Sequence, residues 1–241
     1  MSDFLSVNRI AFEENGIGYI LDEKRENLLF KLCRYMQKKN AEMNVTSITD
    51  DDGIARKHFC DCAFLSDLIA KDAKVADIGC GGGFPCLPLA IFREDVRITA
   101  VDSTAKKIKY VEDTANELGL ANVECVSMRA EEGAHDLNFR ESYDAVCARA
   151  VASLDILCEL CIPYLKIGGS FFAMKGRGGL EELEAAKKAI VTLGAELLCV
   201  HEFSLVCDLE IQSRYVIEIK KVSHTAEQYP RQYSKIKKKP L

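Results

Sequence analysis

The sequence predicts an α/β fold: a mostly parallel seven-stranded sheet with helices on both faces, preceded by a helical N-terminal extension. Two observations predict it. After residue 74, short apolar runs alternate with helix-length amphipathic segments, as expected for a parallel sheet whose crossovers are helices. A glycine-rich loop follows the first apolar run, at the sheet edge where such folds bind ligands.

Composition limits the class of protein. The 241 residues suffice for one α/β domain with an extension, and 48% apolar content can fill its core. The N-terminus lacks the features of a signal peptide, and no stretch approaches about 18 uninterrupted apolar residues. We therefore expect a cytoplasmic, soluble protein without a membrane partner. The 11 cysteines should be reduced, and the pairs Cys60/Cys62 and Cys158/Cys161 are better explained by packing than by a metal site.

We divide the chain into three parts. Residues 1–70 are predicted to be a helical extension packed on the core, because two segments there carry apolar stripes at helical spacing. Residues 71–222 form the α/β domain, and residues 223–241 form a basic tail. From Tyr229 onward the tail has five Lys or Arg and no acid, although the whole chain carries a net charge of −5. Such a tail is either a frayed, solvated terminus or a local phosphate contact.

Seven apolar segments are the predicted strands, at residues 74–78, 97–102, 122–127, 143–149, 169–175, 196–205 and 215–221. Helix-like segments follow the first, second, fourth and fifth of them. The second of these helices is expected to stop at Gly119. No clear helix separates the last two strands, so we expect them to form an antiparallel hairpin that completes the sheet.

The loop after the first predicted strand reads ADIGCGGGFPCLPLA, residues 76–90. Glycine allows a positive φ and close approach of a ligand, and Pro85 suits the first turn of a helix. A dinucleotide fingerprint needs a third glycine where Phe84 stands; the pattern here is Asp-x-Gly-x-Gly-x-Gly, starting at Asp77. A carboxylate before the first glycine suits the ammonium group of S-adenosyl-L-methionine. We therefore favour this cofactor over a nicotinamide dinucleotide.

Asp102 ends the second predicted strand, 23 residues after Gly79. A carboxylate in this place can accept hydrogen bonds from both ribose hydroxyls of an adenosine-type ligand. A strand-ending aspartate can also cap the next helix, although Ser103 or Thr104 could serve as that cap. The residue supports an adenosine-type ligand without choosing between the two cofactors.

Several segments together resemble one family. DIGCGGGFPCLPLA, AVDSTAKK, SMRAEE, ARAVASL, AMKG and the terminal YPR…KKPL are similar to the glucose-inhibited division protein B family of small-subunit rRNA guanine-N7 methyltransferases. NVTSI and KHFCDCAF extend the resemblance over nearly the whole chain. It implies a Rossmann-like class I S-adenosylmethionine-dependent methyltransferase that modifies guanine N7 in the 530 loop, the decoding region of 16S rRNA. The tail departs from the family pattern at Ser234 and Ile236.

The resemblance also implies which residues meet the cofactor. Gly79 and Phe84 would line its site, and Arg149 would stand at the pocket mouth. From sequence alone, residues 129–132 are equally well explained as an ordinary helix start. Arg149 is equally well explained as a charged residue at the end of a strand. The full expected cofactor set is Asp77, Gly79, Gly81, Phe84, Asp102, Ser103, Thr104, Ala130, Glu131 and Arg149.

Methylation of guanine N7 needs little from the protein chemically. This nitrogen carries a free lone pair, so no general base is expected, and catalysis should come from alignment within the site. No catalytic residue is assigned, and Arg149 and Lys175 are candidates at the pocket mouth. His58 is also explained by a structural role. The expected RNA contacts are Lys57, His58, Arg129, Lys175, Arg231, Lys237, Lys238 and Lys239.

The expected partner is 16S rRNA or the 30S subunit with its ribosomal protein, not DNA, and we expect a monomer. Two alternatives stay open. One is a methyltransferase acting on a protein or small molecule, with the N-terminal helices as a lid. The other is a noncatalytic nucleotide- or RNA-binding module that retains only the fold.

Overall fold

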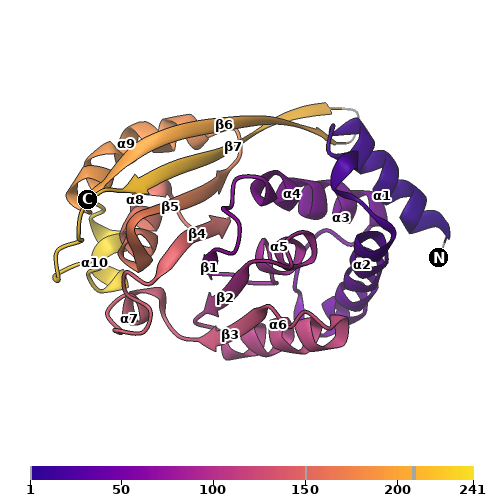
Figure 1. Cartoon of the computed structure of the whole chain (residues 1–241), viewed down its shortest axis with the longest axis horizontal. Coiled ribbons are helices and arrows are strands. Elements are labelled where there is room, and N and C mark those ends of the chain that lie inside the picture. Colours follow the sequence, from indigo (N-terminus) through magenta and orange to yellow (C-terminus); the bar gives the residue numbers. More distant parts are fainter. Residues whose placement is uncertain (1, 150, 208–209) are drawn as a thin grey trace.

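A seven-stranded sheet forms the centre of the molecule in a computed structural model that describes residues 2–149, 151–207 and 210–241. The strand order is β3-β2-β1-β4-β5-β7-β6, with helices on both faces (Figure 1). Strands β1 to β5 are parallel, whereas β7 is antiparallel to β5 and to β6. The fold class predicted from the sequence is confirmed.

The first five strands lie close to their predicted ranges, at Lys74–Ile78, Arg97–Asp102, Val123–Ser127, Tyr143–Arg149 and Leu165–Lys175. Strand β5 begins four residues earlier than predicted. The earlier part pairs Leu165 with Tyr143 across an irregularity in the register. Gly168 obscured this part of the strand in the sequence, because glycine is a poor strand former.

Helices connect the parallel strands: α5 (Cys86–Phe92), α6 (Ala105–Leu118), α7 (Ala130–Gly133), α8 (Leu154–Cys161), a 3₁₀ turn (Ile162–Tyr164) and α9 (Gly179–Thr192). Gly119 ends α6 in a left-handed conformation, as predicted. Helix α7 was absent from the predicted connecting helices, because four residues are too short to show a helical period, but it begins where residues 129–132 were read as a possible helix start. Helices α5 and α6 pack in the apolar cluster on one face of the sheet, and α8 and α9 in the cluster on the other.

The N-terminal segment is helical: α1 (Ser2–Glu14), a 3₁₀ turn (Gly18–Ile20), α2 (Glu23–Met43), α3 (Asp51–Ile54), a π-helical turn (Ala55–Cys60) and α4 (Asp61–Ser66). Asp22 caps α2 by accepting a hydrogen bond from the Arg25 N–H at 2.8 Å. Along α2, Leu32, Cys33 and Met36 are fully buried, as the apolar stripe predicted. Helix α2 contacts α5 and α6, so this segment lies over the face that carries those two helices.

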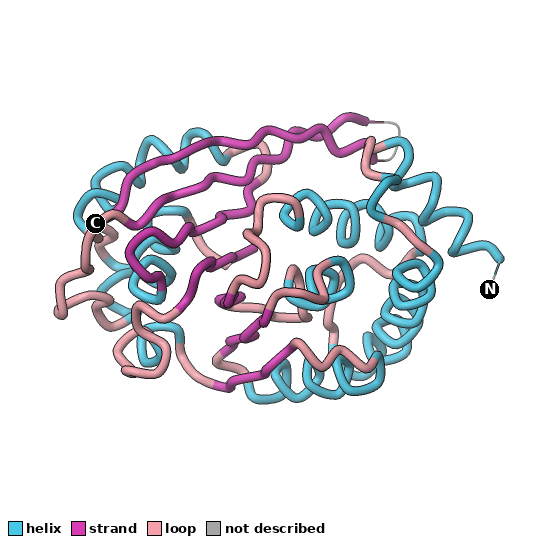
Figure 2. The backbone as a smooth tube through the Cα atoms, viewed as in Figure 1, coloured by secondary structure: helices cyan, strands magenta, loops and turns pink. Residues whose placement is uncertain are grey.

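The C-terminal hairpin is longer than predicted. Strands β6 (Ala195–Cys207) and β7 (Glu210–Lys221) extend past the other strands to the N-terminal helices (Figure 2). There, Asn15 accepts a hydrogen bond from the Val206 N–H at 2.8 Å, and Phe64 stacks on Phe203 with ring centroids 4.5 Å apart. The expectation that β7 begins at residue 215 was wrong. Pairing along the hairpin and docking on the helices satisfy backbone groups that local sequence preference did not assign to a strand.

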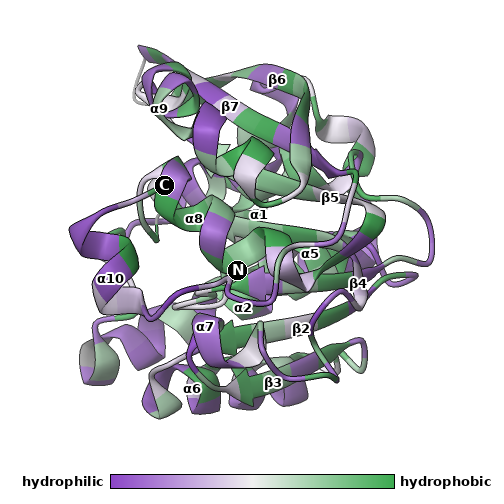
Figure 3. Cartoon of the chain, turned by 90° about the vertical axis from the view of Figure 1, so that its left-hand side faces the viewer, coloured by the Kyte–Doolittle hydropathy of each residue, from purple (hydrophilic) through white to green (hydrophobic). Residues whose placement is uncertain are grey.

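The basic tail is packed against the domain. Arg231 forms a bidentate ion pair with Glu159, at 2.8 and 2.6 Å, and Glu159 is fully buried on α8. Beyond it, helix α10 (Tyr233–Lys238) buries Ile236. Most of α10 is hydrophilic (Figure 3), and Lys237, Lys238 and Lys239 are exposed. The frayed-terminus alternative is therefore wrong, because a buried carboxylate and an apolar contact hold this segment.

The described ranges lack two features of other protein classes. None of the helices there has the length and apolar character needed to cross a membrane. The same residues hold no group of three His, Cys, Asp or Glu side chains that could bind a metal ion. The cysteines are free thiols, and most, including both close pairs, are buried in the core, as their interpretation as packing residues predicted.

Replacing Arg231 by alanine should loosen the tail and destabilise the domain beneath it. In Arg231→Ala, Glu159 would stay buried without its cation, and breaking a buried ion pair in this way costs about 3 to 5 kcal/mol. Urea unfolding should show a loss of that size, and limited proteolysis should first cut the tail. Lys238→Ala, an exposed position on α10, is the control. Equal unfolding free energies for the two variants would contradict the anchoring role of Arg231.

Candidate active site

A pocket with a volume of about 1100 Å³ opens at the carboxyl edge of the parallel strands. The glycine loop after β1 forms its floor together with segments that follow β2, β3 and β4. The pocket brings together most of the sequence-predicted site residues: Lys57, His58, Gly79, Gly81, Phe84, Asp102, Ser103, Thr104, Arg129, Ala130, Glu131, Arg149 and Lys175. Ala150, in the ARAVASL segment, lies outside the described residues.

The glycine loop exposes its backbone to the pocket. Gly79 has φ +75°, and a Cβ built there would lie 2.6 Å from the side chain of Val151, so a larger residue would not fit. Gly81 has φ +54°, and a Cβ there would meet only the Gly79 carbonyl oxygen at 3.9 Å. The face of Gly81 is therefore open, and a ligand can approach the main chain at this point.

Asp102 holds this loop from the side. Its Oδ2 accepts a hydrogen bond from the Gly81 N–H at 3.1 Å, and its Oδ1 accepts one from the Thr104 N–H at 2.8 Å. The Thr104 side chain makes no cap bond at the start of α6, and the carboxylate of Asp102 binds the N–H of Thr104, the residue that precedes the helix. Each carboxylate oxygen has a further lone pair, and the side chain lines the pocket. The hydrogen bonds that Asp102 accepts from the backbone and the predicted ribose role are thus compatible.

Asp77 lies beneath the loop and does not line the pocket. It is fully buried, and its Oδ2 accepts a hydrogen bond from the Cys86 N–H at 3.0 Å, while Oδ1 has no partner among the described residues. Burial raises the pKa of Asp77 to about 7. Because Asp77 is fully buried and does not line the pocket, its geometry does not support the expected direct contact with the ammonium group of a ligand. Its visible role is to hold the start of α5 under the loop.

Phe84, His58 and Arg149 form a stack on the pocket wall. The rings of His58 and Phe84 are 4.4 Å apart and nearly parallel, and the guanidinium of Arg149 lies 5.1 Å from the centre of the Phe84 ring. Arg149 donates a hydrogen bond to Nδ1 of His58 at 3.1 Å, so Nε2 carries the proton and donates to the Thr46 hydroxyl at 2.9 Å. Burial, and then the Arg149 charge, lower the pKa of His58 to about 3. His58 is a neutral, fully bonded side chain, which fits its structural interpretation.

Sequence reasoning missed two residues that hold Arg149 in place. The carboxylate of Asp61 accepts hydrogen bonds from Arg149 at 3.0 Å and from Arg214 at 3.1 Å. These three residues belong to α4, β4 and β7, so one carboxylate joins three parts of the chain. Asp61 lies within the KHFCDCAF segment that carried the family resemblance. Arg214 gave no signal because it lies in the part of β7 that was not predicted.

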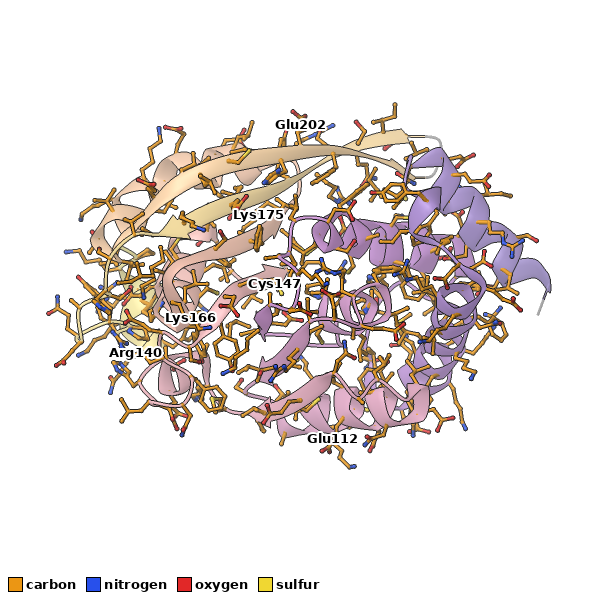
Figure 4. The ribbon with its side chains drawn as sticks, in the orientation of Figure 1. Glu112, Arg140, Cys147, Lys166, Lys175 and Glu202 are labelled. Carbon is orange, nitrogen blue, oxygen red and sulfur yellow. The ribbon has the colours of Figure 1, made fainter. Side chains whose placement is uncertain are left out.

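Lys175 is paired inside the pocket wall. Its ammonium group donates to the Ala152 carbonyl oxygen and to Oε2 of Glu182, both at 2.7 Å, and its side chain is 7% exposed. Figure 4 shows Lys175 in the interior, near the end of β5. The expectation that this cation is available to phosphate is corrected, because Glu182 neutralises it. Glu182 was missed because an acid in the first turn of a helix has an ordinary explanation.

The site fits S-adenosylmethionine on these observations. The open face of Gly81 provides uncovered main chain, and Asp102 provides carboxylate lone pairs at the end of β2. Ser103 and Thr104 are exposed beside Asp102, and Ala130 with Glu131 begin α7 at the end of β3. An adenosine-type ligand can therefore lie across the ends of β1, β2 and β3.

Asp77→Asn should stabilise the protein at pH 8 more than at pH 5. The folded-state pKa near 7 lies above the unfolded value, so the stability linked to the bound proton is lost as the pH rises through 7. An amide carries no such cost, and the advantage of the variant should grow by about 2 kcal/mol between pH 5 and pH 8. Urea unfolding at both pH values measures it, with Asp113→Asn on α6 as the control. A variant less stable than the natural protein at pH 8 would contradict the argument.

Comparisons with solved structures agree with this fold. Two solved structures are similar: an S-adenosylmethionine-dependent O-methyltransferase from Thermotoga maritima and TYW2 from M. jannaschii in complex with AdoMet. The first is 17% identical with a TM-score of 0.53 and covers 79% of this chain and 72% of its own. The second is 14% identical with a TM-score of 0.53 and covers 67% of this chain and 75% of its own. They show that the fold is the Rossmann-like fold of such methyltransferases.

Sequence relatives are much more similar. Two proteins named ribosomal RNA small subunit methyltransferase G match: one from Clostridium perfringens is 38% identical over 99% of both chains. The other, from Clostridium botulinum, is 39% identical over 94% of this chain and 95% of its own. The family model GidB, described as rRNA small subunit methyltransferase G, matches residues 25–211. This chain therefore belongs to the GidB family, as the resemblance of its motifs indicated.

Proposed function

We propose that this chain transfers a methyl group from S-adenosylmethionine to N7 of a guanine in the 530 loop of 16S rRNA. The observation that carries the proposal is family membership along nearly the whole chain, with relatives named for methylation of small-subunit rRNA. The pocket supports it, because uncovered glycine backbone and a strand-end carboxylate lie beside a wall rich in cations. We propose that the protein acts as a cytoplasmic monomer on the 30S subunit or its RNA.

Residues of this chain would hold the cofactor. The Gly79 to Gly81 backbone would meet its amino-acid end, and Asp102, with its neighbours Ser103 and Thr104, its ribose. Ala130 and Glu131 would lie beside its adenine. When bound, S-adenosylmethionine supplies an electrophilic methyl group on a sulfonium. Asp77 would act indirectly by fixing the loop through the Cys86 N–H.

The target nitrogen would need no deprotonation, and the pocket has the matching character. His58 is neutral, and both of its ring nitrogens are hydrogen-bonded within the protein. Lys175 and Arg149 are each paired with a carboxylate. These residues shape and rigidify the wall, orient the base and exclude water, so rate enhancement would come mainly from alignment.

Cations at the pocket and on the tail would bind the RNA backbone. Arg129 has a side chain that is 60% exposed at the pocket rim, 4.0 Å from Glu131, and half-buried Lys57 also lines the pocket. Lys237 to Lys239 are exposed on the packed tail. Because their own charged or hydrogen-bonding groups are bound within the protein, we propose that His58, Lys175 and Arg231 support the RNA site indirectly.

The modified nucleoside tests the reaction. Small-subunit RNA and 30S subunits lacking the modification would be incubated with the protein and labelled S-adenosylmethionine, digested, and analysed by mass spectrometry. We expect label in 7-methylguanosine. Asp102→Ala should weaken cofactor binding about 10- to 100-fold in calorimetry, because a charged hydrogen-bond acceptor is lost. Label in another nucleoside, or none with a wild-type protein that binds the cofactor, would refute the proposed reaction.

A triple variant tests the tail. Replacing Lys237, Lys238 and Lys239 by alanine should weaken binding to 30S subunits or their RNA. It should also reduce the slope of log K against log salt by roughly 0.7 for each lost phosphate contact with single-stranded RNA. Stability should not change, because these side chains are exposed. The control replaces Lys187 and Lys188, which are exposed on α9. Equal salt slopes for the two variants would exclude the tail from RNA binding.

A further inference from the structure

The pocket has two halves, defined by the strand order. The glycine loop, Asp102 and Glu131 follow β1, β2 and β3 on one side. Arg149 and Lys175 end β4 and β5 on the other side of β1. Because the first half fits the adenosine-type cofactor, the second half is the place for the base that receives the methyl group. This assignment rests on the proposed function.

One carboxylate in the second half forms hydrogen bonds to the protein through only one of its two oxygens. Four carboxylates line the pocket in the described part of the chain: Asp61, Asp102, Glu131 and Glu182. Asp102 and Glu131 belong to the cofactor half. Each oxygen of Asp61 is bound to an arginine. Glu182 is left as the carboxylate that can meet the target base.

Glu182 is held firmly through one oxygen. Its Oε2 accepts hydrogen bonds from the Lys175 ammonium at 2.7 Å and from the Leu154 N–H at 2.8 Å. The same ammonium donates to the Ala152 carbonyl oxygen at 2.7 Å, which fixes Lys175 in turn. Oε1 of Glu182 has no hydrogen-bond partner within the described ranges, and the side chain is 35% exposed. A fixed carboxylate thus presents a free acceptor at the pocket wall.

A carboxylate in an RNA-binding pocket repels phosphate, so its presence favours contact with a base. The Watson–Crick edge of guanine carries two adjacent donors, N1–H and the 2-amino group, and a carboxylate accepts from both kinds of group. N7 lies on the opposite edge of the purine. Recognition of the Watson–Crick edge therefore leaves N7 free to face the cofactor half.

We propose that Glu182 selects guanine by accepting hydrogen bonds from its Watson–Crick edge, and that Lys175 is the positioning residue that holds Glu182 for this contact. The target guanine must then be unpaired when it is bound. Adenine presents an unprotonated N1 acceptor at the same edge, which a carboxylate disfavours.

The rival explanation is mechanical. Glu182 and Lys175 bind Leu154 and Ala152, so the pair also clamps the segment that carries Val151 against Gly79. If Glu182 acted only as a clamp, substituting it would change kcat/KM by the same factor for every substrate. Base recognition would affect a substrate that lacks the contacted group differently from one that has it.

A base analogue separates the two roles. Two small-subunit RNAs would be prepared by ligation, one with guanosine and one with inosine at the methylated position. Inosine is chosen because it lacks the 2-amino group of guanosine. For the natural protein we expect kcat/KM to be about tenfold higher with guanosine, the effect of losing a hydrogen bond to a charged acceptor. Glu182→Gln should reduce that ratio to about threefold or less. The neighbouring Glu181→Gln, exposed on α9, is the matched control and should keep the full ratio.

Other outcomes overturn the inference. A natural protein that methylates both RNAs equally well would refute recognition of the 2-amino group without the use of any variant. A Glu182→Gln enzyme that binds cofactor normally, is slower on both RNAs and keeps the full ratio would show a clamp alone, and the proposed function would stand. Absence of 7-methylguanosine with the natural protein and either RNA would instead refute the proposed function and this inference with it.

Discussion

Two aspartates hold the glycine loop between β1 and α5 in a shape that leaves the face of Gly81 uncovered. Asp102 binds the Gly81 N–H from the side, and Asp77 binds the Cys86 N–H from below. A larger residue cannot take the place of Gly79 in this loop, because its Cβ would collide with the side chain of Val151. The arrangement has a cost, since Asp77 is fully buried with one oxygen unpartnered, and this burial raises its pKa. A buried charge is tolerated here because the loop it supports is the floor of the active site.

Asp61 stabilises the pocket wall that adjoins this loop. By binding both Arg149 and Arg214, it links the N-terminal helices to the end of β4 and to the long hairpin. The hairpin also reaches those helices through Asn15 and Phe64. The N-terminal segment is therefore an integral part of the pocket, since it contributes His58 to the stack with Phe84. A mobile lid would need to break each of these contacts.

The sequence predicted the fold well because its signals are local. The alternation of strands and helices, and the helix ends at glycines such as Gly119, are determined by residues that are neighbours in the sequence. Tertiary packing therefore leaves these features unchanged. The extra length of β7 could not be predicted, because its start is stabilised by pairing with β6 and by the distant N-terminal helices. The same limit applies to Arg231, which a charge count places in solvent but which pairs with buried Glu159, 72 residues away in sequence. Arg214 was missed for this reason, because its partner Asp61 is 153 residues away in sequence, whereas Glu182 was missed because an acid in the first turn of a helix has an ordinary explanation.

The pairing of charges within the pocket bears directly on mechanism. A general base needs a free lone pair and a pKa near the working pH. His58 meets neither condition, because Nδ1 accepts from Arg149 and its pKa is near 3. Asp61 has both oxygens bound to arginines, and the Lys175 side chain donates hydrogen bonds to Glu182 and to the Ala152 carbonyl oxygen. A substrate that must lose a proton before attack would find no suitable acceptor among these groups, whereas guanine N7 attacks with its own lone pair. The internal pairing that withdraws His58 and Asp61 from acid–base chemistry also fixes the geometry of the wall, and this fixed geometry supplies the alignment on which the proposed attack by N7 depends.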